Sequence, residues 1–260
     1  MLSLTNIKKE KQSKLDEIKI KFYNQPYTFF KTDYNSVIPW DIYQTWYTKD
    51  LPHKMKERVE LLKRQNPRFR HHLFDDNDCR EFIKNNFKPD VLNAYDNLIP
   101  GAYKADLWRL CVLFINGGIY MDIKLTCMNG FRLIELTEKN HFVKDRPPNA
   151  IFNCLIASQK GNIFIFKAIR QIVRNVQSRF YGNGPLSPTG PELLWNVMTD
   201  NKYKVNIDLY HYKKGAYIIY NNRFVISTEY PEYNNERTTL YNNINTQRYD
   251  KLWYSRGVYK

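Results

Sequence analysis

Several features that mark common protein classes are missing from this 260-residue chain. It has only four cysteines, Cys79, Cys111, Cys127 and Cys154, and no two of them form a C-x-x-C pair. This spacing argues against a zinc ribbon and against a thioredoxin-type site. Cys111 and Cys154 lie in apolar runs, so we expect them to be small core residues. A reducing compartment fits this pattern, although four cysteines would also allow pairing in a secreted protein.

Long apolar runs and targeting signals are also absent. No run reaches the length of a membrane-spanning helix, and the first twenty residues mix apolar side chains with lysines. The sequence contains no N-x-S/T glycosylation site either. We therefore expect no signal peptide and a cytoplasmic protein, in the host cytoplasm if it is viral. Residues 1–34 are predicted to form a basic leader or helix, either solvated or in peripheral contact with a membrane or polymer.

Acidic residues are scarce relative to basic ones, 26 against 40, which gives a formal net charge of +14. Such a surplus suits an anionic ligand, for example a nucleotide diphosphate or an acidic polymer, or simply makes a soluble basic surface. No helix-turn-helix, zinc-finger or RNP-type motif occurs, so we expect no specific nucleic-acid recognition. His71 and His72 have no acidic or cysteine partner nearby in the sequence, and His211 is isolated, so we expect none of them to bind a metal.

What is present is an alternation of strand and helix patterns without an internal repeat. Residues 37–46 and 69–74 are predicted strands, and residues 53–65 between them form a predicted helix that ends at Asn66-Pro67. Asp76 is the expected cap of the next helix. This β-α-β order predicts an α/β fold with a mostly parallel central sheet and right-handed crossovers.

The second half of the chain gives weaker signals. A long helix is predicted from an apolar stripe, and residues 182–191 form a Gly- and Pro-rich loop, either a lid over the acceptor or a static surface loop. Aromatic residues near the C-terminus either close over a ligand or, as we favour, pack onto the sheet. The stripe consists of Phe166, Ile169, Val173, Val176 and Phe180; the C-terminal aromatics are Tyr249, Trp253, Tyr254 and Tyr259.

Residues 105–124 are the most informative segment. An apolar helical face is followed by Asn116-Gly117-Gly118, which supplies the left-handed residues that end a helix, and then by a short buried strand. Asp122 and Lys124 are expected to leave this strand on the same side, because side chains alternate with period two. Ligands of open α/β sheets lie at the carboxyl ends of the strands. We therefore expect Asp122 and Lys124 at a ligand crevice, with Asp106 and Arg109 nearby.

The motifs of the chain resemble those of a known family. They are Val37-Ile38-Pro39 to Gln44-Thr45-Trp46, Asn66-Pro67 with Asp75-Asp76, Ala105-Asp106-x-x-Arg109, Gly117-Gly118-Ile119-Tyr120-x-Asp122, Asn153, and Thr189-Gly190-Pro191. In this order and spacing they resemble the DXD-containing glycosyltransferases of family 32. That family includes initiating mannosyltransferases of yeast and capsular-type enzymes of bacteria and viruses. The resemblance covers roughly residues 37–195, and the last sixty residues match poorly.

The resemblance implies a GT-A-like nucleotide-sugar-binding fold over residues 35–260, as a single domain with a C-terminal extension from about residue 200. It implies a retaining glycosyltransferase that moves a hexose from a UDP- or GDP-sugar to a glycan, a protein-linked glycan or another hydroxyl acceptor. Trp46 would lie near the base, although a plain core role is almost as plausible for it. The implied donor-binding residues are Gln44, Thr45, Trp46, Asp106, Arg109, Tyr120, Asp122 and Asn153; the implied catalytic residues are Asp122, Lys124 and Arg109.

One position departs from the family pattern, because Lys124 replaces the second motif aspartate. That carboxylate ordinarily binds Mn²⁺ or Mg²⁺, and an ammonium group cannot bind a cation. Three interpretations stay open. Lys124 and Arg109 neutralise the diphosphate without a metal; the chain is a non-catalytic relative that binds nucleotide sugars or polyanions; or Asp122 holds the ion together with a C-terminal ligand such as Asp250 or Glu229. We favour retained activity and leave metal dependence open.

Overall fold

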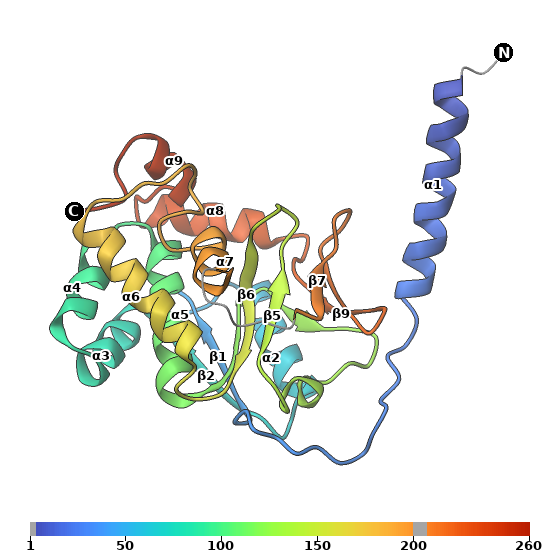
Figure 1. Ribbon diagram of the computed structural model, residues 1–260, viewed down its shortest axis with the longest axis horizontal. Helices are drawn as coiled ribbons and strands as arrows, with labels where there is room; N and C mark the ends of the chain where they lie inside the picture. The colour runs from blue at the N-terminus through green and yellow to red at the C-terminus, as the bar shows by residue number, and fades with distance from the viewer. Residues whose placement is uncertain (1–3, 200–206) are drawn as a thin grey trace.

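The computed structural model describes residues 4–199 and 207–260. A curled nine-stranded sheet forms the centre, and helices cover both of its faces (Figure 1). The strands are β1 (Asp41–Thr45), β2 (Arg70–Phe74), β3 (Gly118–Met121), β4 (Thr126–Cys127), β5 (His141–Lys144), β6 (Ile151–Ser158), β7 (Leu209–His211), β8 (Tyr217–Tyr220) and β9 (Arg223–Ser227). The helices are α1 (Leu4–Tyr23), α2 (His53–Gln65), α3 (Asp76–Asn86), α4 (Pro89–Asn97), α5 (Gly101–Asn116), the 3-10 helix η1 (Leu133–Leu136), α6 (Ile163–Gln177), α7 (Pro191–Thr199), α8 (Tyr233–Asn243) and α9 (Tyr249–Tyr254).

The sheet is mixed, so the predicted α/β class is confirmed but the predicted mostly parallel sheet is wrong. The strand order is β2-β1-β3-β6-β5-β7-β8-β9-β4. Only the pairs β1–β2, β1–β3 and β5–β7 are parallel, and the other five neighbouring pairs are antiparallel. Helices lie between the strands of each parallel pair, α2 between β1 and β2, α2 to α5 between β1 and β3, and α6 and α7 between β5 and β7. Short loops join β5 to β6, β7 to β8 and β8 to β9, and these pairs are antiparallel.

The elements before β3 agree closely with the sequence pattern. Met55, Val59 and Leu62 are the buried residues of α2, as their spacing predicts. Helix α5 ends at Gly117, where φ is 69°, and Gly118 follows with φ of 110°. A side chain at Gly118 would also approach the carbonyl oxygen of Asp41 to 2.9 Å. Both glycines are therefore required to turn the chain from α5 into β3.

Two details of the helices differ from the expectation. The cap of α3 is Asp75 rather than Asp76: its carboxylate accepts from the backbone N–H of Asp78, whose own side chain accepts from the N–H of Asp75. In α6, Ile169, Val173 and Val176 are buried as expected, but Phe166 and the following Phe180 are exposed. The buried face is shifted by one residue, because Ile165, Ala168 and Ile172 fill the space against the neighbouring helices α4, α5 and α7.

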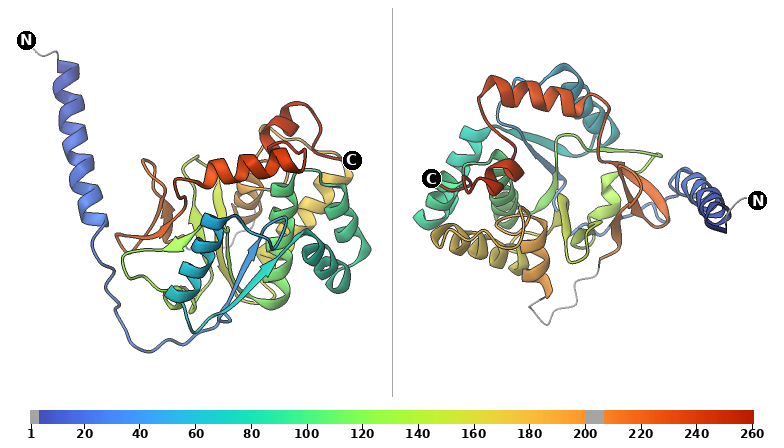
Figure 2. Two further views of the ribbon diagram at one scale, coloured as in Figure 1. Left: turned by 180° about the vertical axis from the view of Figure 1, so that it is seen from behind. Right: turned by 90° about the horizontal axis from the view of Figure 1, so that it is seen from above.

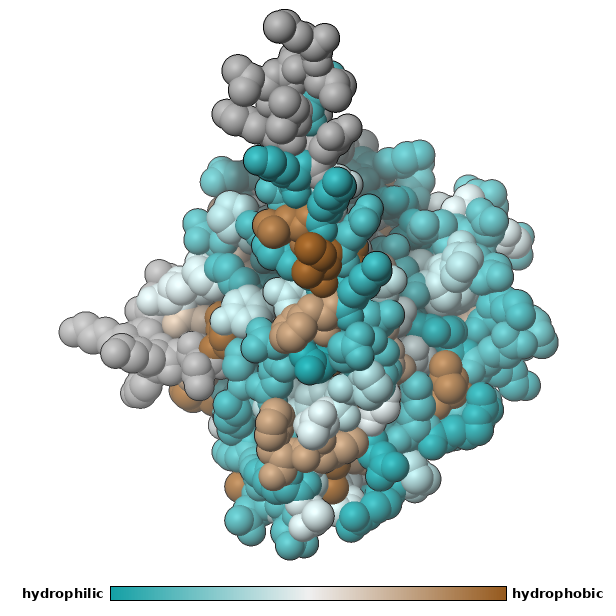
Figure 3. All heavy atoms as spheres, turned by 90° about the vertical axis from the view of Figure 1, so that its right-hand side faces the viewer, coloured by the Kyte–Doolittle hydropathy of each residue, from teal (hydrophilic) through white to brown (hydrophobic). Residues whose placement is uncertain are grey.

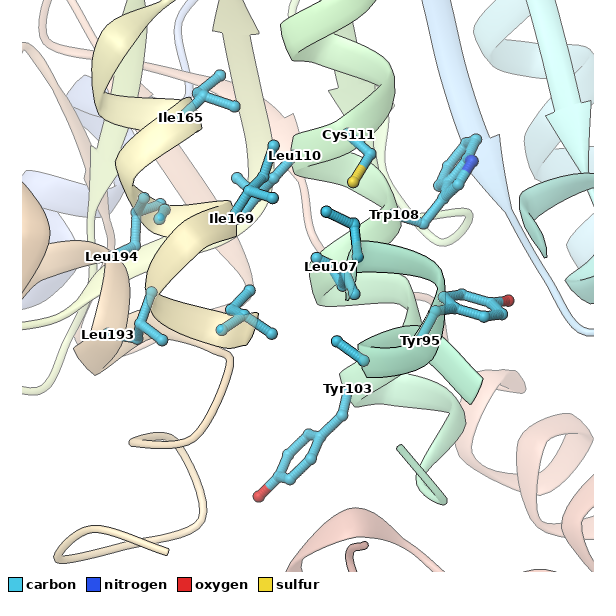
Figure 4. Close-up of a cluster of buried hydrophobic side chains, with 14 of the residues drawn as sticks. Tyr95, Tyr103, Leu107, Trp108, Leu110, Cys111, Ile165, Ile169, Leu193 and Leu194 are labelled. Atoms are coloured by element: carbon cyan, nitrogen blue, oxygen red, sulfur yellow. The ribbon is translucent and has the colours of Figure 1, made fainter. Parts of the chain in front are cut away.

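The period-two pattern of the strands divides the core between the two faces of the sheet. Tyr43, Tyr120 and Ile156 point to the face covered by α3–α7, and Ile42 and Ile119 point to the opposite face, which α2 covers. Figure 4 shows the first cluster, in which apolar side chains of α5 meet those of α6 and α7. This packing fixes α5, and with it the ends of β1 and β3, in one position.

Helix α1 extends away from the rest of the molecule (Figures 1 and 2). Its last residue, Tyr23, packs against Phe224 of β9, and Lys214 forms an ion pair with Asp16. Several apolar side chains of α1 are exposed, among them Ile18 and Phe22. Figure 3 shows apolar groups on the side of the molecule that carries α1. In residues 4–199 and 207–260, no helix is both long and apolar enough to span a bilayer. The cytoplasmic location and the leader assignment stay predictions, and the expected start of the C-terminal extension, near residue 200, lies outside the described residues.

Candidate active site

Two adjoining cavities lie at the carboxyl ends of β1 and β3. The smaller has a volume of about 220 Å³ and begins at Thr45 and Trp46, the end of β1. The larger, of about 440 Å³, extends toward β5, β6 and the loop before α7. Arg109 and Asp122 line both cavities, as do aromatic residues of α8 and α9. Asp122 therefore stands where the two cavities meet, as its position after a central strand predicts.

Asp122 is held in place by its neighbours but keeps access to the cavities. The Tyr120 hydroxyl donates to its Oδ1 at 2.9 Å, and a guanidinium nitrogen of Arg109 lies 3.6 Å from the same oxygen. The side chain retains 22% of its exposure, compared with 6% for Arg109. Asp122 is thus a carboxylate that a ligand can reach from both cavities.

Asp106, Arg109 and Asn153 form a buried network behind Asp122. Asp106 Oδ1 accepts a hydrogen bond from the amide of Asn153 at 2.9 Å and lies 3.2 Å from Arg109. Arg109 also donates to the carbonyl oxygens of Ala105 and, at 2.6 Å, Asn153. Burial raises the pKa of Asp106, whereas Arg109 and these hydrogen bonds favour its charged form. The side chains of the network bond chiefly to one another and to the backbone, so they support Asp122, and all three also line the larger cavity.

The predicted loop at residues 182–191 completes this network. The Thr189 hydroxyl donates to Oδ2 of Asp106 at 2.8 Å, and Thr189 is buried. A side chain at Gly190 would come within 3.3 Å of the same oxygen. Pro185, Leu186 and Gly190 line the larger cavity. The end of the loop is therefore anchored on Asp106, while its middle forms part of the cavity wall.

The three residues at the end of β1 have different surroundings. Gln44 is fully buried and lines neither cavity; its amide donates to the carbonyl oxygen of Asp122 at 3.3 Å, and its oxygen accepts from His71 at 2.8 Å. Thr45 lines the smaller cavity, but its hydroxyl donates to the carbonyl oxygen of Phe74. Trp46 lines the same cavity, and its buried indole N–H has no partner among the described residues. Trp46 is therefore the residue of the three that is best placed to contact a ligand.

Lys124 lies in the turn after β3, not on the strand itself, yet it lines the larger cavity together with Asp122. Its ammonium group is 5.1 Å from the ring centroid of Tyr233. Burial disfavours the charged form of Lys124, but the ionisable groups around it, which are Cys154, Tyr233, Asp122 and Glu229, outweigh this and raise its pKa. Lys124 is therefore a protonated amine at neutral pH.

The C-terminal segment supplies residues that the sequence patterns do not assign to the site, apart from Tyr249, for which closure over a ligand is the less favoured alternative. Tyr233 and Tyr241 of α8 and Tyr249 of α9 line both cavities, and Arg237 and Arg248 line the larger one. Figure 2 shows α8 and α9 along one side of the molecule. Tyr233, Arg237 and Tyr241 are spaced at i, i+4 and i+8, which places them on one face of α8, so their common direction could have been predicted. Of the remaining C-terminal aromatics, Tyr259 is buried in the core.

Histidines and cysteines also differ from the expectations. His72 has no acidic partner nearby in the sequence but has one in space, because its Nε2 lies 2.7 Å from Oδ1 of Asp41. His211 pairs with Asp145 at 2.9 Å, and both line the larger cavity. Cys154, expected in the core, lines this cavity too. These contacts join residues that are far apart in the sequence, and no local pattern reveals them.

The residues around Asp122 do not form the divalent-metal site that the resemblance implies. Mn²⁺ and Mg²⁺ prefer several oxygen ligands, and the second motif position carries the ammonium group of Lys124. Asp250 and Glu229 line neither cavity. Within the described ranges, no group of three or more His, Cys, Asp or Glu side chains is arranged to hold a metal ion. This donor set does not fit the ion.

The sequence of residues 52–143 matches the family described as the glycosyltransferase sugar-binding region containing a DXD motif. In this region the chain is similar to the DXD-type glycosyltransferases. It is 29% identical over 140 residues to inositol phosphoceramide mannosyltransferase 3 of Schizosaccharomyces pombe, a match that covers 54% of this chain and 38% of that protein. It is 26% identical over 203 residues to an uncharacterized glycosyltransferase of Acanthamoeba polyphaga mimivirus, covering 70% of this chain and 78% of the relative.

Among solved structures, the PaToxG glycosyltransferase is similar with a TM-score of 0.49 and 20% identity over 75% of each chain. The match to the fission-yeast mannosyltransferase spans well under half of that protein. The matched family region contains Asp106, Arg109, Asp122 and Lys124, whereas Trp46, Asn153 and all of α8 lie outside it. The region shared with the family thus includes the support of Asp122, and the walls of the two cavities extend beyond it.

Proposed function

We propose that this DXD-type glycosyltransferase transfers a hexose, with mannose as the first candidate, from a UDP- or GDP-sugar to a hydroxyl acceptor, with retention of configuration. The observation that carries the proposal is Asp122, an accessible carboxylate fixed by Tyr120 and Arg109 at the junction of two cavities. The choice of mannose is supported by a relative named as a mannosyltransferase. The glycan or protein-linked glycan acceptor remains the expectation from the sequence.

The two cavities suggest how the substrates are divided. The smaller cavity, with Trp46 and Tyr47, suits a nucleoside, since aromatic rings stack on bases. The larger cavity, which contains Lys124, suits the diphosphate, the transferred sugar and the acceptor. Asp122, between them, accepts hydrogen bonds from the hydroxyls of the ribose or the sugar. In this arrangement Gln44, which lines neither cavity, positions Asp122 without touching the donor, whereas Asp106, Arg109 and Asn153 hold Asp122 from the wall of the larger cavity.

In the proposed reaction the bond between the sugar C1 and the diphosphate oxygen breaks, and the acceptor oxygen forms a new bond to C1 on the same face. The acceptor proton moves to an oxygen of the departing diphosphate. The negative charge that develops on the diphosphate is stabilised by Lys124, whose ammonium group is already in the cavity. A fixed cation in a partly buried site needs no reorganisation during the reaction.

The test is a panel of UDP- and GDP-hexoses, including GDP-mannose, offered to the full chain with a simple mannoside acceptor, with Mn²⁺ or with EDTA. Release of nucleoside diphosphate and formation of a retained glycoside from one donor would support the proposal. No release and no donor-induced rise in melting temperature with any donor would contradict it. A thermal shift without release of nucleoside diphosphate would indicate instead that the protein binds nucleotide sugars but does not catalyse transfer, the alternative raised by Lys124 at the motif position.

A further inference from the structure

Three cations from different elements gather around two tyrosine rings beside the larger cavity. Lys124 and Arg237 both lie over the ring of Tyr233, with their charged groups 5.1 and 5.3 Å from its centroid. Arg58 of α2 lies 5.6 Å from the ring centroid of Tyr230, and the two rings are 5.5 Å apart. We refer to these five residues as the cation–tyrosine cluster.

The cations of this cluster lack neutralising partners. Among the described residues none of the three forms an ion pair with a carboxylate, and the Nε atoms of Arg58 and Arg237 are buried without a hydrogen-bond partner. The acidic groups nearby are engaged elsewhere or more distant. Glu236 accepts from the hydroxyl of Tyr230 and the N–H of Lys54, and Asp122 and Glu229 act on Lys124 through their charge without forming an ion pair with it.

Such a concentration of charge is costly unless an anion binds there. Burying a cation without a partner disfavours folding, and like charges close together add to that cost. Burial lowers the pKa of Arg58, as expected for a desolvated cation. The tyrosine faces recover part of the cost through cation–π attraction, but they cannot neutralise the charge. The unpaired donors therefore indicate an anionic ligand.

The cluster faces the larger cavity through two of its cations. Arg237 and Lys124 both line that cavity, and so does Tyr233, whereas Arg58 does not. Arg58 instead donates to the carbonyl oxygen of Lys124 at 3.4 Å. Arg237 keeps its place through a hydrogen bond from a terminal nitrogen to Asn234 on the same helix, at 2.9 Å. Arg237 and Lys124 are thus accessible to a ligand in the cavity, and Arg58 supports the turn that carries Lys124.

We infer that Arg237 of α8 and Lys124 form a clamp for the diphosphate of the donor, with Arg58 as a positioning residue. The inference rests on the proposed function, since it names the group that holds the leaving diphosphate. Arg237 comes from the C-terminal segment, and Lys124 replaces the motif aspartate. The two positions together provide, from protein cations, the positive charge that the DXD motif otherwise obtains through a metal ion. A guanidinium group suits this task because its N–H donors match phosphate oxygens.

The test compares binding of GDP and UDP with binding of guanosine and uridine, by calorimetry on the full chain. Arg237→Gln is expected to weaken binding of the preferred nucleoside diphosphate by about tenfold to a hundredfold, the effect of one charged hydrogen-bonding partner. Its affinity for the nucleoside should stay within about twofold of wild type, because the lost contact is to phosphate. Lys124→Gln should show the same difference. The matched control is Arg174→Gln, which removes an arginine of α6 whose guanidinium bonds to the neighbouring Gln171.

The possible outcomes distinguish a failure of the clamp from a failure of the proposed function. If wild type binds a nucleoside diphosphate and transfers sugar but Arg237→Gln binds it equally well, the clamp is refuted and the function stands. Equal losses for nucleoside and diphosphate would also refute the clamp, since they would show a structural role. If wild type binds no nucleoside diphosphate and turns over no donor, both proposals fail. Should Arg237→Gln not fold, Lys124→Gln and Arg237→Lys decide, because the clamp requires a loss from the first and at least partial binding by the second.

Discussion

The hydroxyl of Tyr120 donates a 2.9 Å hydrogen bond to Oδ1 of Asp122, from one end of a strand to the residue just past it. The guanidinium group of Arg109 lies over the same tyrosine ring, 4.4 Å from its centroid, and 3.6 Å from the same carboxylate oxygen. Burial raises the pKa of Tyr120, so its hydroxyl stays a donor throughout the neutral range. The orientation of Asp122 therefore depends on Arg109, and Arg109 in turn depends on Asp106 and Asn153.

The first prediction concerns the support of the site. Asp106→Asn should lower the free energy of unfolding by about 3 kcal/mol, because it leaves the buried Arg109 without its closest countercharge. Chemical denaturation measures this directly. Asp96→Asn is the matched control, since Asp96 pairs with Arg80 at the surface and should cost less than about 1 kcal/mol. Equal effects of the two substitutions would show that the pair between Asp106 and Arg109 gives no special support.

The second prediction concerns Lys124. Lys124→Asp restores two motif carboxylates two residues apart, so Mn²⁺ should raise the melting temperature of this variant more than that of wild type. Its donor turnover should become sensitive to EDTA, because hard cations prefer carboxylate oxygens. Lys124→Gln is the control, since it removes the charge without adding a carboxylate ligand. If Mn²⁺ affects Lys124→Asp and Lys124→Gln alike, Lys124 does not occupy the second motif position in space.

The third prediction is a pH dependence of stability that arises at His71. Burial lowers the pKa of His71 to about 4, from an ordinary value near 6.5, and its Nε2 donates to the side-chain oxygen of Gln44. Between these values the unfolded chain binds a proton that the folded chain does not, so stability falls as the pH drops from 6.5 toward 4.

The melting temperature of His71→Gln should therefore fall less than that of wild type as the pH drops from 6.5 toward 4. The exposed His53 provides the control, because His53→Gln should follow the wild-type curve. Parallel curves for wild type and His71→Gln would disprove the assignment of this pH dependence to His71. The measurement needs only thermal unfolding at a series of pH values.

Much of the support of the site could be predicted from the sequence because it depends on local patterns. The spacing of Asp106 and Arg109 on one helix, the glycines after it, and the position of Asp122 after a strand are all short-range features. They follow from helix periodicity, left-handed backbone conformations and strand direction. The contacts that these residues make with one another in the structure agree with the local patterns, and their roles in catalysis stay predictions.

Other features depend on contacts between distant segments. The motif places Gln44 at the donor, but its side chain is buried between His71 and the backbone of Asp122, and only tertiary packing decides this. The antiparallel strands after β3 follow from loop geometry that composition does not specify. The helical spacing of Arg237 with Tyr233 and Tyr241 indicates a common face but not what that face meets, because the relation of Arg237 to Lys124 arises only when α8 lies across the cavity. In each case the decisive neighbour is far away in the chain.

The most direct test of the whole account is sugar transfer by Asp122→Asn, measured with the donor that wild type prefers. The amide keeps the size of the side chain and one acceptor for Tyr120, so the melting temperature should change little. Turnover should fall by at least about 10²-fold, the scale of a lost contact to the transition state. Turnover at the wild-type rate in a folded Asp122→Asn protein would contradict the account, because it would remove Asp122 from the reaction.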